Sequence, residues 1–347
     1  MARIDVTVRG GGIFGLACAW EMCRRGANVR LIERERIGAG SSGGLVGALA
    51  PHVPENWNPK KAFQFESLIM AERFWAEVAA VSGRDPGYLR SGRLQPILDD
   101  AALDRSEARG REAAELWQGK AIWSVVPAAD YADWLLPGPT GKLIHETLSA
   151  RLHPRQAAAA LVAAIEARGG EVVFGDAEDE GSVVWAIGHR GLEELSVALG
   201  KTIGAPIKGQ AACFKLDRAE MPQLLADSVH VIPHVDGTVA IGSTTEREFD
   251  APDTTDARLD EVIDRARAVC PALRDAPVID RWAGLRPRSR SRAPMLGQWP
   301  GRPGHFVANG GFKIGFGMAP KVAEVMADLV LEGRDGIPSG FRVEDNL

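Results

Sequence analysis

The sequence predicts an α/β fold, in which a discontinuous Rossmann-like dinucleotide-binding domain is combined with a second domain built on a mostly antiparallel β-sheet. Strand and helix patterns alternate near both ends of the chain, which is typical of a parallel sheet covered by helices. The middle of the chain instead shows strands joined by short turns. A length of 347 residues also exceeds what one ordinary hydrophobic core organises, so two domains are expected.

The spacing of apolar residues predicts the individual elements in chain order. Strands are predicted over residues 3–9, 28–32, 92–98, 142–145, 171–174, 183–187 and 306–308. Helices are predicted over residues 14–25, 62–81, 100–118, 154–167, 256–268 and 319–331. Between residues 209 and 242 the pattern is one of short strands, with a hairpin signal at Asp236-Gly237.

Because the antiparallel patterns interrupt the alternating ones, each domain is expected to be assembled from separate segments. The dinucleotide-binding domain is assigned residues 1–88, 145–205 and 282–347. The second domain is assigned residues 89–144 and 206–281.

Composition and charge argue against several classes of protein. The formal net charge of −5 does not suit a dedicated nucleic-acid-binding protein. No run of about 18 apolar residues is present, so no transmembrane segment is expected, and the N-terminus lacks a signal-peptide pattern. The cysteines have neither redox-pair nor metal-site spacing; they are Cys18, Cys23, Cys213 and Cys270. We therefore expect reduced thiols and a cytoplasmic protein.

A glycine-rich turn follows the first predicted strand. Gly10 permits a tight turn, Gly12 leaves room for a pyrophosphate to approach the backbone, and Gly15 lets the helix pack against the strand. The N-terminus of that helix presents N–H groups and the positive end of its dipole to phosphate. Glu33 ends the second strand, where a carboxylate accepts hydrogen bonds from ribose hydroxyls. The turn therefore predicts a dinucleotide site, with a glycine turn that binds no ligand as the alternative.

NAD and FAD both use such a turn, and the segments that follow favour FAD. Residues 38–44 are small and glycine-rich, which suits a cofactor that extends beyond its pyrophosphate. Residues 183–188 form an apolar strand and a glycine turn, similar to the strand that packs near FAD in many two-domain flavoproteins. A plain buried strand is the alternative interpretation of this second segment.

Two segments in the last quarter of the chain are the most specific, Trp282-Ala283-Gly284-Leu285-Arg286-Pro287 and Asn309-Gly310-Gly311-Phe312-Lys313-Ile314-Gly315. Together with the Gly10–Glu33 unit they resemble the superfamily of D-amino acid oxidases, glycine oxidases and sarcosine oxidases, and the glycine oxidases most closely. Further matches follow in order along the chain: Ser41-Ser42-Gly43-Gly44, Ala50-Pro51-His52, His153-Pro154-Arg155, Gly209-Gln210, Val231-Ile232-Pro233 and Ile241-Gly242-Ser243-Thr244.

This resemblance implies an FAD domain, a substrate domain, and the oxidation of an amine or α-amino acid. In the family, hydride passes from the carbon that bears nitrogen to flavin N5, water hydrolyses the resulting imine, and O₂ or another acceptor reoxidises the flavin. We expect noncovalent FAD, because no cysteine lies near the family's attachment position. The residues expected to contact FAD are Gly10, Gly12, Ile13, Phe14, Gly15, Glu33, Arg34, Ser41, Ser42, Gly43, Gly44, Val172, Val173, Ala186, Gly188, Gly311, Phe312, Lys313, Ile314 and Gly315.

The substrate site is expected to contain Arg286, Lys313, His230 and His52. The resemblance places Arg286 at the position that holds a substrate carboxylate, and an arginine fork suits that ligand. Lys313 matches a second basic position near the flavin. His230 stands where amino acid oxidases have a tyrosine, with a solvent-facing strand histidine as the alternative. His52 lies where a loop approaches the flavin ring in relatives, and it is expected to line the pocket.

Other departures from the family concern the substrate. His234 replaces an arginine, and a run of three arginines between Arg288 and Arg292 replaces an aspartate, so it indicates either an acidic substrate or a solvated loop. Two alternatives to an amine oxidase stay open: a flavin dehydrogenase that passes electrons to a quinone or a protein, and a non-catalytic FAD-binding accessory subunit. The expected partners are a small amine or amino acid with a carboxylate, an electron acceptor and, as a possibility, a second copy of the chain.

Overall fold

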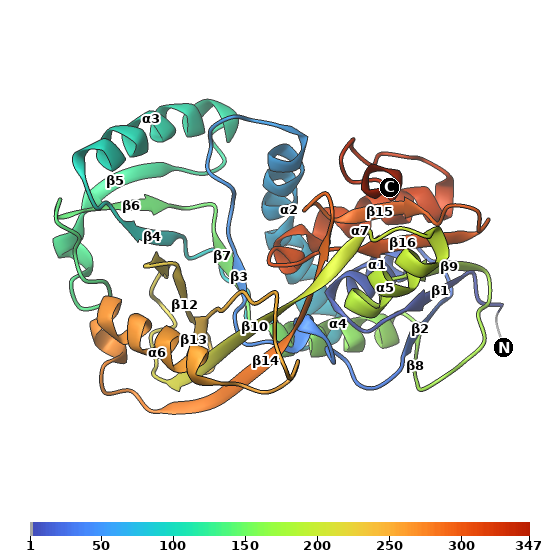
Figure 1. The fold of residues 1–347 in the computed structure, drawn as a ribbon. Coiled ribbons are helices and arrows are strands. Elements are labelled where there is room, and N and C mark those ends of the chain that lie inside the picture. The colour runs from blue at the N-terminus through green and yellow to red at the C-terminus, as the bar shows by residue number, and fades with distance from the viewer. Residues whose placement is uncertain (1–2) are drawn as a thin grey trace.

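The computed structural model describes residues 3–347 and shows two lobes (Figure 1). One lobe contains both termini and a six-stranded sheet, and the other is built on an eight-stranded sheet. This arrangement confirms the predicted fold class of a Rossmann-like domain with a second, mostly antiparallel domain. No helix in the described part of the chain is long and apolar enough to cross a membrane.

The six-stranded sheet has the order β15-β16-β9-β1-β2-β8. The central strand β1 pairs in parallel with β2 and with β9, and β15 pairs antiparallel with β16 at one edge. Its strands are β1 (Val6–Arg9), β2 (Val29–Glu33), β8 (Glu171–Phe174), β9 (Ser182–Trp185), β15 (Met295–Gln298) and β16 (His305–Asn309). The helices of this lobe are α1 (Ile13–Arg24), α2 (Pro59–Ser82), α4 (Pro154–Ala167), α5 (Gly188–Leu199) and α7 (Gly315–Glu332).

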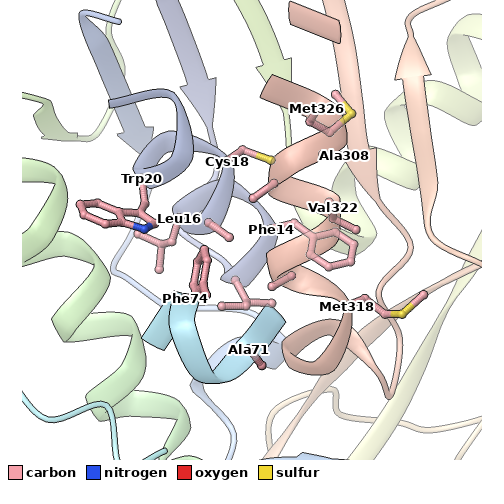
Figure 2. Packing of buried hydrophobic residues seen from close by; sticks show 14 of the residues in the cluster. Phe14, Leu16, Cys18, Trp20, Ala71, Phe74, Ala308, Met318, Val322 and Met326 are labelled. Carbon is pink, nitrogen blue, oxygen red and sulfur yellow. The ribbon is translucent and has the colours of Figure 1, made fainter. Parts of the chain in front are cut away.

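The largest hydrophobic core lies where α1 meets α2 and α7. Figure 2 shows Phe14 and Leu16 of α1 near Phe74 of α2 and Val322 of α7, all of them buried. Nearly every side chain of α1 is buried, because a sheet and other helices surround it. This packing fixes the N-terminus of α1 relative to the end of β1, which is where the glycine-rich turn lies.

The eight-stranded sheet has the order β14-β10-β13-β12-β11-β4-β6-β5, and its pairs are antiparallel except β11 with β4. Two helices, α3 (Asp100–Leu116) and α6 (Ala257–Val269), belong to this lobe. Its strands are β4 (Arg93–Pro96), β5 (Trp123–Pro127), β6 (Lys142–Glu146), β10 (Gly204–Lys215), β11 (Gln223–Ala226), β12 (Val229–Pro233), β13 (Thr238–Gly242) and β14 (Val278–Ser289). A two-stranded sheet of β3 (Ala48–Leu49) and β7 (Ala150–Arg151) accompanies them.

Strand β14 was not among the predicted strands. It pairs with β10 along almost its whole length and forms the edge of the eight-stranded sheet. Charged residues and Pro287 hide the strand pattern in the sequence, and an edge position is where a sheet accepts proline. The predicted division between residues 281 and 282 falls inside β14, so we propose that the last FAD-domain segment begins after Ser289.

Other elements were also missed, among them α5, β5, β15 and the two-residue strands β3 and β7. Helix α5 has a strongly apolar side, but its start lies in the glycine turn at Gly188, where the sequence pattern ends the preceding strand. Strand β15 is only four residues long and lies between glycine- and proline-rich turns. Neither α5 nor β15 is detected from the periodicity of apolar residues, because that periodicity is recognised only over a longer, uninterrupted run.

Candidate active site

A cavity of about 360 Å³ extends from the glycine-rich turn of the six-stranded sheet to β14 of the eight-stranded sheet. It gathers segments from opposite ends of the chain, from Arg9 to Phe316. The predicted residues that line it are Gly10, Gly12, Ile13, Phe14, Glu33, Arg34, Ser41, Ser42, Gly44, Ala186, Gly188, His230, Arg286, Gly311, Phe312, Lys313 and Gly315. Those that do not line it are Gly15, Gly43, His52, Val172, Val173 and Ile314.

The glycine turn after β1 has no room for a side chain at Gly10 or Gly15. Gly10 has a φ of 108°, and a Cβ there would lie 2.5 Å from the carbonyl oxygen of Ala186. A Cβ at Gly15 would lie 1.9 Å from the carbonyl oxygen of Gly10. Gly15 therefore acts below the cavity wall, where it lets α1 pack closely against the turn.

The same turn is rich in hydrogen-bond donors. Ile13 donates its backbone N–H to Oγ of Ser42 at 2.9 Å, and Gly11 donates to Oε2 of Glu33 at 2.7 Å. The N–H groups of Gly12 and Phe14 donate to no acceptor in residues 3–347. A pyrophosphate fits at this position, because the start of a twelve-residue helix offers free N–H donors and the neighbouring glycines have no side chains.

Four of the predicted residues outside the cavity have other positions. Val172 and Val173 lie on β8, at the sheet edge beyond β2. Gly43 packs its α-carbon against the carbonyl of Gly38, and Ile314 caps the N-terminus of α7. The sequence pattern identifies these segments as near the cavity, but it does not tell which residues face it.

His52 is the clearest departure from the predicted substrate site. Its backbone N–H donates to Oε1 of Gln64 at 2.7 Å, and its Nδ1 lies close to the same oxygen. Burial lowers the pKa of His52, which favours the neutral ring. The side chain is therefore held against α2 and does not line the cavity described above.

Arg286 is a buried cation on the cavity wall. Its side chain comes from β14 and is only 8% exposed, and one guanidinium nitrogen donates to the carbonyl oxygen of Thr244 at 3.1 Å. Within residues 3–347 no carboxylate lies in ion-pairing distance of it. Burial lowers the pKa of Arg286 to about 10. A guanidinium this deeply buried without a counterion favours an anionic ligand in the cavity.

A polar network that the sequence did not reveal lies behind Arg286. Glu246 is buried and accepts hydrogen bonds from Gln210 at 3.0 Å and from Arg258 at 2.8 Å. Lys208 lies 3.7 Å from the same carboxylate. Because Glu246 already has these cationic and amide partners, it is not free to neutralise Arg286 completely.

Lys313 lies at the rim of the cavity and donates to Oγ1 of Thr245 at 2.7 Å. Partial burial and the positive charge of Arg286 lower the pKa of Lys313. The preceding residue, Phe312, has a φ of 43°, and its N–H donates to the carbonyl of Pro287 at 3.1 Å. This strained backbone ties the loop before α7 to β14 and so places the two cations on the same wall.

His230 also lines the cavity, as predicted, but as a neutral side chain. Burial and the nearby cations Arg93, Lys313 and Arg286 lower its pKa to about 4. Its Nδ1 has no hydrogen-bond partner among the described residues. His230 therefore adds a neutral imidazole to the cavity wall, while its Nδ1 is buried behind the cavity surface.

Gly209 determines where the guanidinium of Arg286 lies. A Cβ at Gly209 would lie 2.0–2.1 Å from three guanidinium atoms. We expect Gly209→Ala to displace this group and weaken a carboxylate inhibitor about tenfold or more, as is typical of a disturbed charged hydrogen bond. Titration of the inhibitor against the FAD-loaded protein, followed by flavin absorbance, measures this. In the background of Arg286→Ala the same substitution should change the affinity little, and equal effects in both backgrounds would contradict the assignment.

The neutral state of His230 predicts a loss of stability in acid. Its folded pKa of about 4 lies below the ordinary value of 6.5, so the unfolded chain binds more protons between these values and stability falls as the pH decreases. From pH 7.5 to pH 5 this group alone contributes a loss of about 2 kcal/mol. Urea unfolding of the native chain and of His230→Gln at both pH values measures it. Identical pH dependence of the two proteins would contradict the burial of His230.

Comparison with known proteins gives one family and several relatives. Residues 5–329 match the family model DAO, described as FAD dependent oxidoreductase. The chain is 28% identical to the glycine oxidase of Pseudomonas putida, over 99% of each chain. It is 26% identical to the bifunctional protein ThiO/ThiG of Nostoc sp., over 94% of this chain, but it spans only 53% of that protein's length.

Solved structures give the same fold. Iminodiacetate oxidase from Chelativorans sp. BNC1 superposes with a TM-score of 0.85 at 22% identity, covering 97% of this chain and 98% of that one. Glycine oxidase from Geobacillus kaustophilus superposes with a TM-score of 0.83 at 20% identity, covering 99% of both chains. At these identities the superpositions show the shared fold.

Proposed function

This chain belongs to the family of FAD-dependent oxidoreductases, and we propose on that premise that it oxidises the carbon–nitrogen bond of a small amine or amino acid that carries a carboxylate. The family resemblance predicted from the sequence is thereby confirmed. The observation that supports the substrate class is Arg286, a buried cation on the cavity wall without a carboxylate partner in the described chain. Relatives named as oxidases of glycine and of iminodiacetate are consistent with such a ligand.

The residues that line the cavity suit the chemical groups of FAD. The N–H groups at the start of α1 suit the pyrophosphate, and Glu33 suits the ribose, since its carboxylate lies at the end of β2 and lines the cavity. Ser42 and the loop before α7 supply further lining. None of the four cysteines, which all lie within residues 3–347, lines the cavity, and this supports noncovalent binding.

When bound, FAD supplies the two-electron redox chemistry, and the protein supplies position and electrostatics. Arg286 would bind the substrate carboxylate with its free guanidinium N–H groups, and this fixes the carbon that bears nitrogen relative to the cofactor. Lys313 adds positive potential on the same wall. His230 contributes a neutral side chain to the cavity wall, which does not repel an amine.

Anaerobic titration of the FAD-loaded protein tests this proposal. Glycine, sarcosine, iminodiacetate, D-amino acids and acidic amino acids are each added, and bleaching of the flavin absorbance is followed. At least one carboxylate-bearing amine should bleach the flavin, and the same amine as its methyl ester should do so far more slowly. A protein that binds FAD but bleaches with none of them would favour the accessory-subunit alternative and would refute the proposal.

The electron acceptor is proposed to be O₂, as expected from the sequence. Peroxide formed in step with substrate consumption supports an oxidase, whereas fast turnover with an artificial quinone and negligible peroxide would select a dehydrogenase. A cytoplasmic location and a homo-oligomer are kept as further proposals. Cell fractionation and sedimentation of the FAD-loaded protein test them.

A further inference from the structure

Two histidines and an aspartate meet where the two lobes adjoin. His153 caps the N-terminus of α4, whereas His234 and Asp236 lie in the turn that joins β12 to β13. One potential metal-binding atom of each residue lies within 4.8 Å of the other two. None of the three lines the cavity described above, so binding of cofactor or substrate does not account for them.

His234 has a buried nitrogen without a partner. The residue is 1% exposed, its Nδ1 lies 3.3 Å from Oγ1 of Thr238, and its Nε2 makes no hydrogen bond within residues 3–347. Burial of a polar atom without a partner is costly, so native proteins rarely leave one unoccupied. A ligand that accepts the Nε2 lone pair would remove this cost.

His153 and Asp236 are separated as two ligands of one cation would be. The backbone N–H of Gln156 lies 3.3 Å from Nδ1 of His153, and this long contact would be given up when Nε2 binds a cation, because the ring proton then sits on Nδ1. That Nε2 lies 3.4 Å from Oδ2 of Asp236. Two ligands of a tetrahedral zinc ion, each bound at about 2.0–2.1 Å, are about 3.3–3.4 Å apart.

Thr238 orients the other two residues. Its hydroxyl donates to Oδ1 of Asp236 at 2.6 Å and lies beside Nδ1 of His234. A metal-binding histidine or carboxylate usually makes a hydrogen bond through its other polar atom, because this bond fixes the direction of the atom that binds the metal. Nε2 of His234 is thereby left for a shared ligand, and Oδ2 of Asp236 makes only long contacts, with Nε2 of His153 at 3.4 Å and with Nε2 of Gln156 at 3.5 Å.

Burial lowers the pKa of both histidines; Asp236 raises it again, whereas Arg155 near His153 and Arg151 near His234 lower it further. The nearest arginines are engaged elsewhere: Arg151 donates to the carbonyls of Gly87 and Ala219, and Arg155 pairs with Asp280 at 2.9 Å. Asp236 is exposed, so an ion can enter from solvent and keep water in its remaining positions.

We propose that His153 Nε2, His234 Nε2 and Asp236 Oδ2 bind a divalent first-row cation of the zinc type, completed by water. Two imidazoles and one carboxylate are ligands that such ions prefer over calcium or magnesium. The site joins the start of α4 in one lobe to the β12–β13 turn in the other, so the ion would link the lobes. It is independent of the proposed amine oxidation.

Calorimetric titration of zinc chloride into chelator-treated, FAD-loaded protein tests the site. We expect saturable binding of one zinc ion per chain and a rise of the thermal unfolding midpoint with zinc concentration. In Asp236→Asn, which keeps the acceptor for Thr238, the affinity should fall at least about tenfold. His234→Gln should have the same effect.

A matched control uses a histidine outside the cluster. His145 lies on β6 and is half-buried, and His145→Gln should bind zinc as the native chain does. The flavin spectrum of each variant reports whether it is folded. If the native chain shows no saturable binding, or if Asp236→Asn binds zinc as tightly as the native chain, the site is refuted.

Discussion

Replacement of Arg286 by alanine is expected to lower kcat/KM for a carboxylate-bearing amine about 100- to 1,000-fold, which corresponds to about 3–4 kcal/mol. The buried guanidinium faces the cavity with one hydrogen bond to Thr244 and no carboxylate partner in residues 3–347. Its loss removes the charge that binds the substrate carboxylate and the orientation that this charge provides. FAD content should stay unchanged, because the glycine turn that suits the pyrophosphate is far along the cavity from β14.

Single-turnover flavin reduction and steady-state kinetics separate the loss of substrate binding from the loss of substrate orientation. Arg286→Lys should recover part of the activity, because a lysine keeps the charge but not the bidentate geometry. Arg288→Ala is the matched control: this arginine is two residues along the same strand, half-buried, and does not line the cavity. Equal losses in Arg286→Ala and Arg288→Ala would show that β14 is merely destabilised and that Arg286 has no particular role.

Replacement of Gly15 by alanine is expected to abolish FAD binding and to lower the free energy of unfolding by about 1–3 kcal/mol or more. The new Cβ would lie 1.9 Å from the carbonyl oxygen of Gly10, a backbone atom that cannot move as a flexible side chain does. To relieve the clash, α1 must shift away from the turn. That shift moves the N–H groups of Gly12 and Phe14, on which the fit for the pyrophosphate depends.

Flavin absorbance after reconstitution and desalting measures the bound FAD, and urea unfolding measures the stability. The matched control is Gly336→Ala, where a Cβ would meet no atom closer than 4.0 Å and which lies outside the cavity. Gly336→Ala should bind one FAD per chain as the native protein does. Full FAD binding by Gly15→Ala would contradict the role assigned to the close contact between α1 and the turn.

Local patterns were sufficient for most elements. The predicted helix over residues 154–167 and the strand over 171–174 coincide with α4 and β8. These segments have regular apolar periodicity and clear ends, such as Pro154 at the start of α4. Strand β14 was not predicted from its local pattern, because it is stabilised by pairing with β10 and its own sequence lacks a clear strand periodicity.

The predicted site residues likewise divide into those that line the cavity and those that lie outside it. Gly10, Glu33, Arg286 and Lys313 were predicted from motifs and line the cavity, whereas His52 was predicted from the same family resemblance and contacts Gln64 instead. Their functional roles stay predictions until the variants above are measured. A motif identifies the segment that approaches a site, but the direction of each side chain depends on neighbours far away in the sequence.

By itself, the sequence determined the fold class, the dinucleotide turn and the family, because these depend on short-range patterns of glycine, apolar spacing and motif order. Only the tertiary structure decided that Gly209 leaves space for the guanidinium of Arg286, that Glu246 is occupied by other partners, and that His153 meets His234 across the two lobes. These contacts join residues that are tens of positions apart. Their energies depend on burial and distance, which exist only once the chain has folded.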